Sequence, residues 1–204
     1  IQNLLNVTGM TILNNFTASY GADAVAAMGI TQKINMVPMY IALGLSQGIM
    51  PLISYTYASR KYQRMKKTLT FSLKAALTFI IAVAVLYFAG ADFLIRLFMN
   101  NETIIGYGAK FLRGFCLALP FMCIDFVAVG VFQATGMGRE ALVFAILRKI
   151  LLEIPALYIL NALFPLYGLA YAQFVAEVVL AVAAVIILVR LFKKLERKET
   201  GRTE

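Results

Sequence analysis

Apolar residues fill long stretches of this chain, and charged residues are largely confined to the segments between them. Residues 1–20 carry no charge, and residues 35–57 form another uncharged stretch. About 20 consecutive apolar residues allow an α-helix to cross the roughly 30 Å hydrocarbon core of a bilayer. The pattern therefore predicts an all-α, polytopic transmembrane bundle of six helices. These helices are expected at about 1–20, 22–57, 69–91, 105–136, 141–163 and 166–192, followed by a basic tail at 193–204.

The second predicted helix is longer than a bilayer requires. Residues 22–57 would extend roughly 54 Å at 1.5 Å per residue, so we expect this helix to bend, to project, or both. Pro38 and Pro51 are the expected kinks, because proline removes a helical hydrogen bond. Gly44 and Gly48 form a G-x-x-x-G pair, which favours close helix packing and adds two hinge candidates.

Three smaller features complete the reading of the chain. Residues 91–104 mix apolar and charged side chains and are expected to form a short interfacial segment. Cys116 and Cys123 would lie roughly 10 Å apart on one helix face, which is too far for a disulfide, so packing is their expected role. The chain opens inside an apolar stretch without Met or a basic N-terminal region, which indicates a fragment beginning within a helix.

The composition is typical of a chain built for lipid. Hydrophobic residues make up 61% of the chain and charged residues 14%, against about 45–50% and about 25% in soluble domains. The mean hydropathy is +0.81. The charged side chains are too few and too clustered to form the polar shell of an aqueous globule, and the apolar content excludes disorder.

Basic residues mark one side of the predicted bundle. The net charge is +9, and fifteen of the nineteen Lys and Arg residues fall in 60–74, 139–149 and 190–202. Because six helices alternate in direction, these three segments lie on the same side of the membrane. An excess of Lys and Arg is typical of the cytoplasmic side, so the C-terminus is expected there. Membrane topology thus explains the positive charge without a nucleic-acid partner.

Three acids lie about halfway along predicted helices, at Asp125, Glu153 and Glu177. An acid at the bilayer centre costs roughly 2.5–3.5 kcal/mol, so each one needs a water-filled cavity, a partner or a proton. Three carboxyl groups at similar depth suggest a polar chamber that binds a solute or an ion. The alternative is private pairing. Lys149 precedes Glu153 by four residues, and Arg148 or Lys149 could reach Asp125 or Glu177.

The first two predicted helices carry amides in place of acids. Asn6, Asn35 and Gln47 offer hydrogen-bond donors and acceptors without the cost of a full charge. Such residues could line a pathway through the bundle. The alternative is ordinary hydrogen bonding between helices.

The sequence argues against enzymatic chemistry. It contains no His, no P-loop motif and no G-x-G-x-x-G motif, which removes His-dependent hydrolysis and the usual nucleotide sites. An intramembrane aspartyl enzyme would want two facing acids, and Asp125 is the only Asp deep inside a predicted span. We therefore expect a protein that is not an enzyme and that uses no cofactor.

Four motifs occur in the order found in one family of membrane proteins. The most specific is G-x-x-Q-G-x-x-P-L-I-x-Y, which runs from Gly44 to Tyr55. V-F-Q-A-T-G-M-G-R-E at 131–140, L-R-K-I-L-L-E-I-P at 147–155 and Y-G-L-A-Y-A-Q-F-V-A-E-V-V at 167–179 follow it. Together they cover most of the chain, which resembles the multidrug and toxic compound extrusion (MATE) transporters.

This resemblance implies a place for the chain in a larger molecule. Such transporters consist of two six-helix bundles and export cationic drugs in exchange for H⁺ or Na⁺. Residues 1–192 would be the C-terminal lobe, which also explains the start within a helix. The resemblance assigns Gln47 and Pro51 to the eighth-helix motif and Gln173 and Glu177 to the twelfth.

Further correspondences concern the coupling ion. The resemblance places Arg148 and Pro155 in the eleventh helix. The sodium-coupled branch carries a Glu where this chain has Asn6, which cannot titrate. That branch also has an Asp in the tenth helix, the helix of Asp125, although the register differs by a few residues. A Na⁺ site at Asp125 is therefore one expectation.

These observations lead to one hypothesis, that the chain belongs to a secondary active antiporter working by alternating access. Asp125 and Glu177 are expected to bind the coupling H⁺ or Na⁺ or an organic cation, with Gln47 and Asn35 along the route. The full set of candidate binding residues is Asp125, Glu177, Glu153, Arg148, Lys149, Asn6, Asn35, Gln47 and Gln173.

The expected partners and the competing hypotheses follow from the same reading. The partners are the lipid bilayer, an organic cation and an N-terminal lobe of the same polypeptide, and the location is a bacterial plasma membrane. A lipid-linked oligosaccharide flippase of the same superfamily is the nearest alternative, but such flippases typically use a strongly cationic cavity. A non-transporting membrane scaffold is the second alternative, and an intramembrane enzyme is a distant third.

Overall fold

The computed structural model of the chain describes the backbone of residues 2–200 and the side chains of residue 4 and residues 7–197. Every regular element in this part of the chain is helical, which confirms the predicted all-α class. The elements are α1 (Gln2–Ala18), α2 (Ala22–Ala58), α3 (Tyr62–Ala89), α4 (Ala91–Arg96), α5 (Glu102–Ala134), α6 (Gly138–Ile146), the π-helix η1 (Leu147–Glu153), α7 (Ile154–Leu163) and α8 (Gly168–Thr200).

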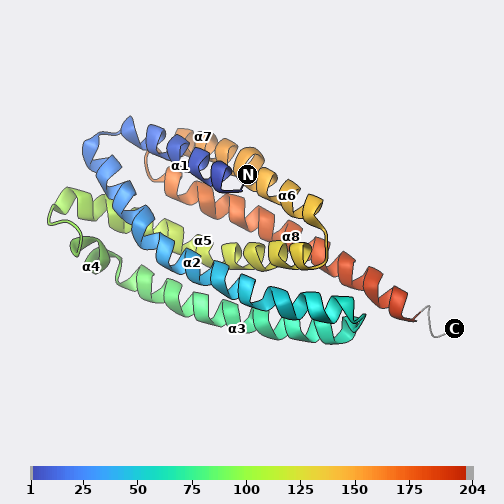
Figure 1. Cartoon of the computed structure of the whole chain (residues 1–204). Coiled ribbons are helices and arrows are strands. Elements are labelled where there is room, and N and C mark those ends of the chain that lie inside the picture. The colour runs from blue at the N-terminus through green and yellow to red at the C-terminus, as the bar shows by residue number, and fades with distance from the viewer. Residues whose placement is uncertain (1, 201–204) are drawn as a thin grey trace.

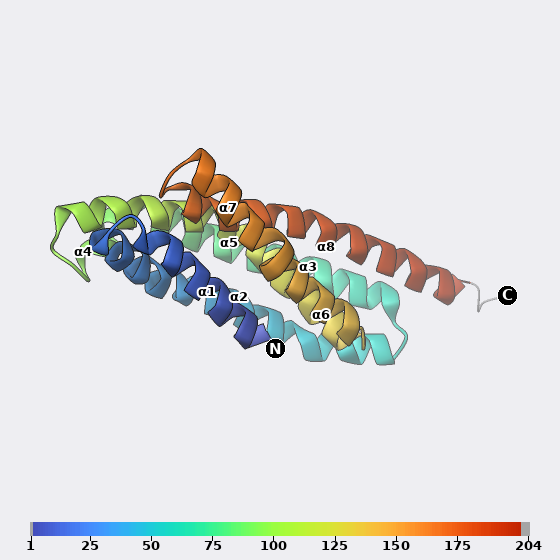
Figure 2. The same cartoon turned by 90° about the horizontal axis from the view of Figure 1, so that it is seen from above.

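The long helices lie side by side along one common direction (Figures 1 and 2). The α2–α3 turn, the α5–α6 turn and the end of α8 lie at one end of the bundle (Figure 1). The α1–α2 turn, α4 and the α7–α8 turn lie at the other end (Figure 1). The three segments rich in basic residues therefore lie at or toward the same end, as the alternation of six spans requires.

Helix α5 is the centre of the bundle. It packs against α2, α3, α4 and α8, and twenty of its 33 residues are buried. The outer helices instead turn apolar side chains outward, such as Phe71 and Leu86 on α3, which are 75% and 70% exposed. Exposed apolar side chains in such numbers indicate contact with lipid. By length and hydropathy, α2, α3, α5 and α8 are each able to cross a membrane.

Several helix boundaries differ from the expected ones because packing extends beyond the apolar runs. Helix α3 begins at Tyr62, not near 69, and continues through a basic segment. Met65 in that segment is fully buried against the core at this end of the bundle. Similarly, α8 continues through most of the predicted tail, because Phe192 and Leu195 pack on the same core. Residues 193–200 are thus part of α8.

The predicted fifth helix consists of three pieces. Helix α6 begins at Gly138, a π-helical segment covers Leu147–Glu153, and α7 follows. Pro155 lies just beyond the π-helical segment. Proline lacks an N–H and clashes with the carbonyl four residues before it, so a local widening of the helix relieves the strain. Such π-helical turns occur frequently at functional sites.

Helix α2 contains both Pro38 and Pro51 and remains continuous, and its course bends between its two halves (Figure 1). The prediction that Gly44 and Gly48 pack closely against another helix is wrong within this chain. Both residues are exposed, and a Cβ added at either would meet no atom within 4 Å. The residue between them makes the close contact. Ser46 Oγ donates a hydrogen bond to the carbonyl of Phe126 at 2.6 Å, which joins α2 to α5.

The predicted role of the two cysteines is confirmed. Cys116 and Cys123 are both free thiols and both are buried on α5. They pack in separate apolar clusters of the bundle. Cys116 belongs to the cluster that contains Ile34, and Cys123 belongs to the cluster that contains Ile80.

The approach of α2 to α5 yields a prediction about stability. A Cβ at Gly130 would lie 2.6 Å from Ser46 Oγ, so Gly130→Ala must displace α2 or break the Ser46 hydrogen bond. We expect a loss of about 1–3 kcal/mol, the usual effect of overpacking, measured as a lower Tm of the full-length protein in detergent. Gly106→Ala on the same helix is the control, because its Cβ meets no atom. Equal Tm values would contradict the predicted contact.

The α5–α6 turn yields a second prediction. Gly136 has φ +77°, a region in which an L-residue costs roughly 1–2 kcal/mol, although space is free around it. Gly136→Ala should therefore lower the Tm of the full-length protein. Gly138→Ala is the matched control, because its Cβ is equally free but the residue lies in α6, where Ala is favoured. A Gly136→Ala variant as stable as Gly138→Ala would show that the turn adopts another backbone conformation.

Candidate functional site

The three mid-helix acids are buried in one layer of the bundle. Asp125 on α5 and Glu177 on α8 are each 1% exposed, and Glu153 at the end of η1 is 8% exposed. Along both α5 and α8 the acids fall between two apolar clusters. One contains Val127 and Leu180, and the other contains Phe115 together with residues of α8 before Glu177. The layer is therefore closed off by apolar side chains above and below.

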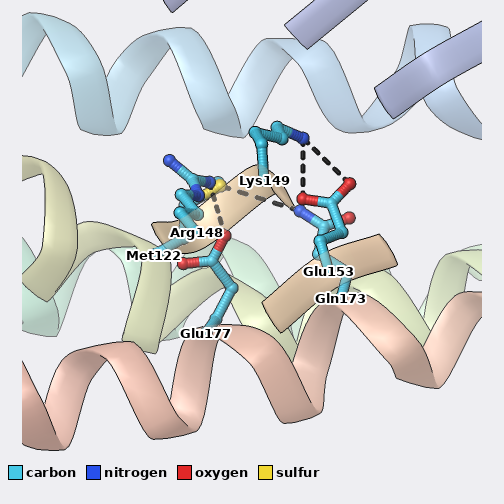
Figure 3. Close-up of polar contacts among 6 residues, drawn as sticks. All are labelled: Met122, Arg148, Lys149, Glu153, Gln173 and Glu177. Atoms are coloured by element: carbon cyan, nitrogen blue, oxygen red, sulfur yellow. Dashed lines mark hydrogen bonds and ion pairs between the residues drawn. The ribbon is translucent and has the colours of Figure 1, made fainter. Parts of the chain in front are cut away.

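Arg148 and Glu177 form a buried ion pair between η1 and α8. Figure 3 shows the two side chains pointing toward each other. They are 12% and 1% exposed. The guanidinium of Arg148 also lies 5.0 Å from the ring centre of Phe126 on α5, which is a cation–π distance. The pair thus links three helices. Removal of Arg148 would leave uncompensated acid charge inside the bundle, which is strongly destabilising.

Lys149 and Glu153 form a second ion pair one residue further along η1. Lys149 Nζ donates to both carboxylate oxygens of Glu153, at 2.9 and 2.7 Å (Figure 3). Gly9 of α1 lies directly against this pair, and a Cβ there would be 3.3 Å from Lys149 Nζ and 3.4 Å from Glu153 Oε1. Glu153 therefore pairs with Lys149 on the same helix, which is the alternative that the i,i+4 spacing suggested.

Asp125 has no basic partner of its own. No N–H or hydroxyl group of the described residues donates to its carboxylate oxygens, and the carboxyl group of Glu177 lies within hydrogen-bonding reach of them. Its charged neighbours are Glu177 and Arg148, and Arg148 is already paired with Glu177. The layer thus holds three carboxyl groups and two basic side chains. One carboxyl group is left without a counter-charge.

The basic residues of this layer change the charge count made from the sequence. Arg148 and Lys149 were assigned to the basic side of the bundle, but both are largely buried and paired with acids. Of the fifteen basic residues, twelve others lie in the described parts of the three segments, and Arg202 lies outside the described residues. The asymmetry between the two ends of the bundle is therefore smaller than expected, but it persists.

The amides are only partly brought to the layer. Gln173 on α8 is half-buried, and its Nε2 lies 3.9 Å from Met122 Sδ on α5 (Figure 3). Asn35 is buried on α2 with an unpartnered Oδ1. The adjacent Ile34 belongs to the same apolar cluster as Leu112, which lies well before Asp125 along α5, so Asn35 lies away from the layer. Gln47 follows Ser46 at the depth of the layer, yet its side chain is exposed. The side chain of Asn6 lies outside the described residues.

Three residues of the site were not predicted from the sequence. Phe126 stacks on Arg148, Ser46 joins α2 to α5 beside the layer, and Gly9 allows α1 to lie on the Lys149–Glu153 pair. In the sequence, the position of Ser46 between two glycines is the only local indication of its contact with α5. Nothing in the spacing around Gly9 indicates that it lies against the Lys149–Glu153 pair. Within the described chain, no group of three Cys, Asp or Glu residues is arranged to hold a metal ion.

Comparison with known proteins gives the family. The sequence profile of the MatE family matches residues 1–159. The multidrug export protein MepA of Staphylococcus saprophyticus is 35% identical over 192 residues, which are 94% of this chain and 42% of that protein. MepA of a bovine Staphylococcus aureus strain is 33% identical over the same shares of both chains. The chain thus spans less than half the length of these curated relatives.

Solved structures share the fold. An outward-facing structure of a multidrug resistance MATE family transporter superposes with a TM-score of 0.89 at 19% identity, over 96% of this chain and 45% of that chain. The Vibrio cholerae MATE transporter VcmN in its bent form gives 0.86 at 20% identity, over 97% and 44%. The matches in sequence and fold establish that this chain belongs to the MATE family of membrane transporters and forms one lobe of the fold.

Proposed function

We propose that this chain is the C-terminal lobe of a multidrug efflux antiporter that exports organic cations in exchange for H⁺ or Na⁺. The observation that carries the proposal is the buried layer with three carboxyl groups and two basic side chains. The similarity to MepA proteins, which are named as multidrug export proteins, supports the choice of substrate class. The excess of acid favours a cationic cargo over the phosphates of a lipid-linked sugar.

The proposed coupling rests on competition for the unpartnered carboxyl group. A charge left bare at mid-depth costs roughly 2.5–3.5 kcal/mol, so Asp125 binds a proton or a small cation when no organic cation is present. Glu177 shares this role because Arg148 cannot neutralise two carboxylates at once. An organic cation that enters the layer replaces the coupling ion. One charge is thereby exchanged for another across the membrane.

Helix α1 is the proposed moving element. Among its described residues only Gly9, Leu13 and Thr17 are buried, which is a single narrow stripe at four-residue spacing. Thr11 and Asn14 instead face outward, although most of the bundle exterior is apolar. A polar outer face suits a water-filled cleft shared with a second lobe. Movement of α1 along its stripe would uncover the Lys149–Glu153 pair beneath Gly9, and thereby open the layer.

The proposed setting is a bacterial plasma membrane with the C-terminus in the cytoplasm. The basic residues that remain at the end of the bundle formed by the α2–α3 turn, the α5–α6 turn and the end of α8 support this orientation. The other partners are the bilayer and an N-terminal lobe on the same polypeptide. The coupling ion is the only cofactor in this proposal.

The coupling proposal predicts the effect of replacing each of these two acids by its neutral amide. In the full-length protein in proteoliposomes, Asp125→Asn and Glu177→Gln should each lower ion-driven efflux of an organic cation at least tenfold, because neither amide can release a proton or bind a cation by charge. Glu102→Gln is the control, since that side chain is 80% exposed at the opposite end of the bundle from the basic segments. Intact coupled efflux in both layer variants would disprove the assignment.

The second ion pair is proposed to be structural, which predicts a different pattern. Lys149→Met leaves Glu153 uncompensated and should destabilise the full-length protein by about 3 kcal/mol. The double variant Lys149→Met/Glu153→Leu should recover more than half of that loss and retain efflux. Lys66→Met, which removes an exposed partner of Glu196, should cost less than about 1 kcal/mol. If the double variant were stable but inactive, Glu153 would belong to the transport machinery.

A further inference from the structure

A groove runs along the outside of the bundle where α6 and η1 pass α8. Its volume is about 500 Å³, and Phe132 of α5 forms its floor. Apolar side chains form its walls, among them Val143 and Leu151 on one side and Val179 on the other. These three are 53%, 61% and 48% exposed, so the groove is open to the surroundings of the bundle.

The groove ends among basic side chains. Arg139 and Glu140 line it at the start of α6, and Ile187 lines it on α8. Arg190 and Lys194 follow Ile187 by three and seven residues, so they lie on the same face of α8. With Lys193 and Arg197 they surround a second hollow of about 440 Å³. Within residues 7–197, none of these four α8 side chains forms an ion pair with an acid.

We propose that the groove and the basic face of α8 together bind one anionic phospholipid, with an acyl chain in the groove and the phosphate on Arg190 and Lys194. Between Val179 and Ile187 the groove follows α8 for roughly 12 Å, a length suited to part of an extended acyl chain. The groove lies within the apolar part of α8 and its mouth lies where the basic run begins. That is the boundary between hydrocarbon and headgroups.

Charge selects this occupant over others. Arg139 and Glu140 are the charged residues that line the groove, and four basic side chains of α8 line the adjoining hollow. The α8 acid within this basic run, Glu196, is paired with Lys66. The basic excess therefore repels an organic cation and attracts a phosphate. Lys and Arg near an anionic surface each contribute about 1 kcal/mol, which corresponds to about a fivefold preference per side chain. A zwitterionic lipid fits the groove equally well but gains little from the basic face. The site is therefore specific for the headgroup charge.

The test uses the full-length protein in phosphatidylcholine vesicles that contain brominated lipid, which quenches nearby tryptophan. This chain has no Trp, so Leu151→Trp places a reporter on the groove wall, and the signal of the parent protein is subtracted. We expect brominated phosphatidylglycerol to quench this reporter at mole fractions at least tenfold lower than brominated phosphatidylcholine. Val85→Trp on α3, which is 61% exposed outside the groove, should show no such preference.

Charge variants complete the test. Arg190→Gln/Lys194→Gln in the Leu151→Trp protein should weaken the phosphatidylglycerol preference by up to roughly 30-fold. Arg64→Gln/Lys67→Gln, the same change of charge on exposed residues of α3, should leave the preference within twofold. If Leu151→Trp fails to fold, Val179→Trp reports from the opposite wall of the groove.

Several results would overturn the proposal. Equal quenching by the two lipids would remove the headgroup specificity. An equal loss in the α3 charge variant would reduce the effect to general surface charge. Displacement by soluble glycerophosphoglycerol at the concentration of the lipid would show that the groove takes no acyl chain. Displacement by tetraphenylphosphonium would make the groove a cation site, and protection from all lipids by dimer formation would make it an interface between copies.

Discussion

An unbalanced set of charges inside an apolar bundle is the constraint on which the structure depends. Arg148 and Lys149 enter the interior from one π-helical segment, and each is matched by an acid, Glu177 and Glu153. Asp125 is left over beside the first pair. Both the packing of α8 against η1 and the proposed exchange of cations follow from how this excess charge is neutralised. The apolar clusters on either side keep the exchange within one layer.

The backbone around the layer is adapted to hold these groups. The π-helical turn ahead of Pro155 places two adjacent basic residues so that one reaches α8 and the other lies under α1. The hydrogen bond from Ser46 fixes α2 to α5 one residue after Asp125. In contrast, α1 is held by only a narrow stripe of buried residues. The proposed gating of access uses this rigid layer with one loosely held wall, and it needs no large rearrangement of the other helices.

Much of this was predictable from the sequence because the signals are local. Charge-free runs predict the helical class, and the i,i+4 spacing of Lys149 and Glu153 predicts their pairing. The unpredicted features depend on contacts between distant segments. Gly44 and Gly48 form a packing motif, yet the close approach of α2 to α5 occurs at Ser46 and Gly130. Which face of α2 meets α5 depends on the rotation of α2 about its own axis, and local sequence does not determine it. The continuation of α8 beyond its apolar run likewise depends on burial of Phe192 and Leu195 against other helices.

The most direct measurement is the number of ions released when an organic cation binds to the full-length protein, determined by calorimetry in buffers of different ionisation enthalpy and at varied Na⁺ concentrations. The account predicts release of about one H⁺ or one Na⁺ per bound monovalent cation, and loss of that release when Asp125 is replaced by Asn. Binding that releases neither ion, or release that is unchanged without Asp125, would contradict the claim that the unpartnered carboxyl group carries the exchange.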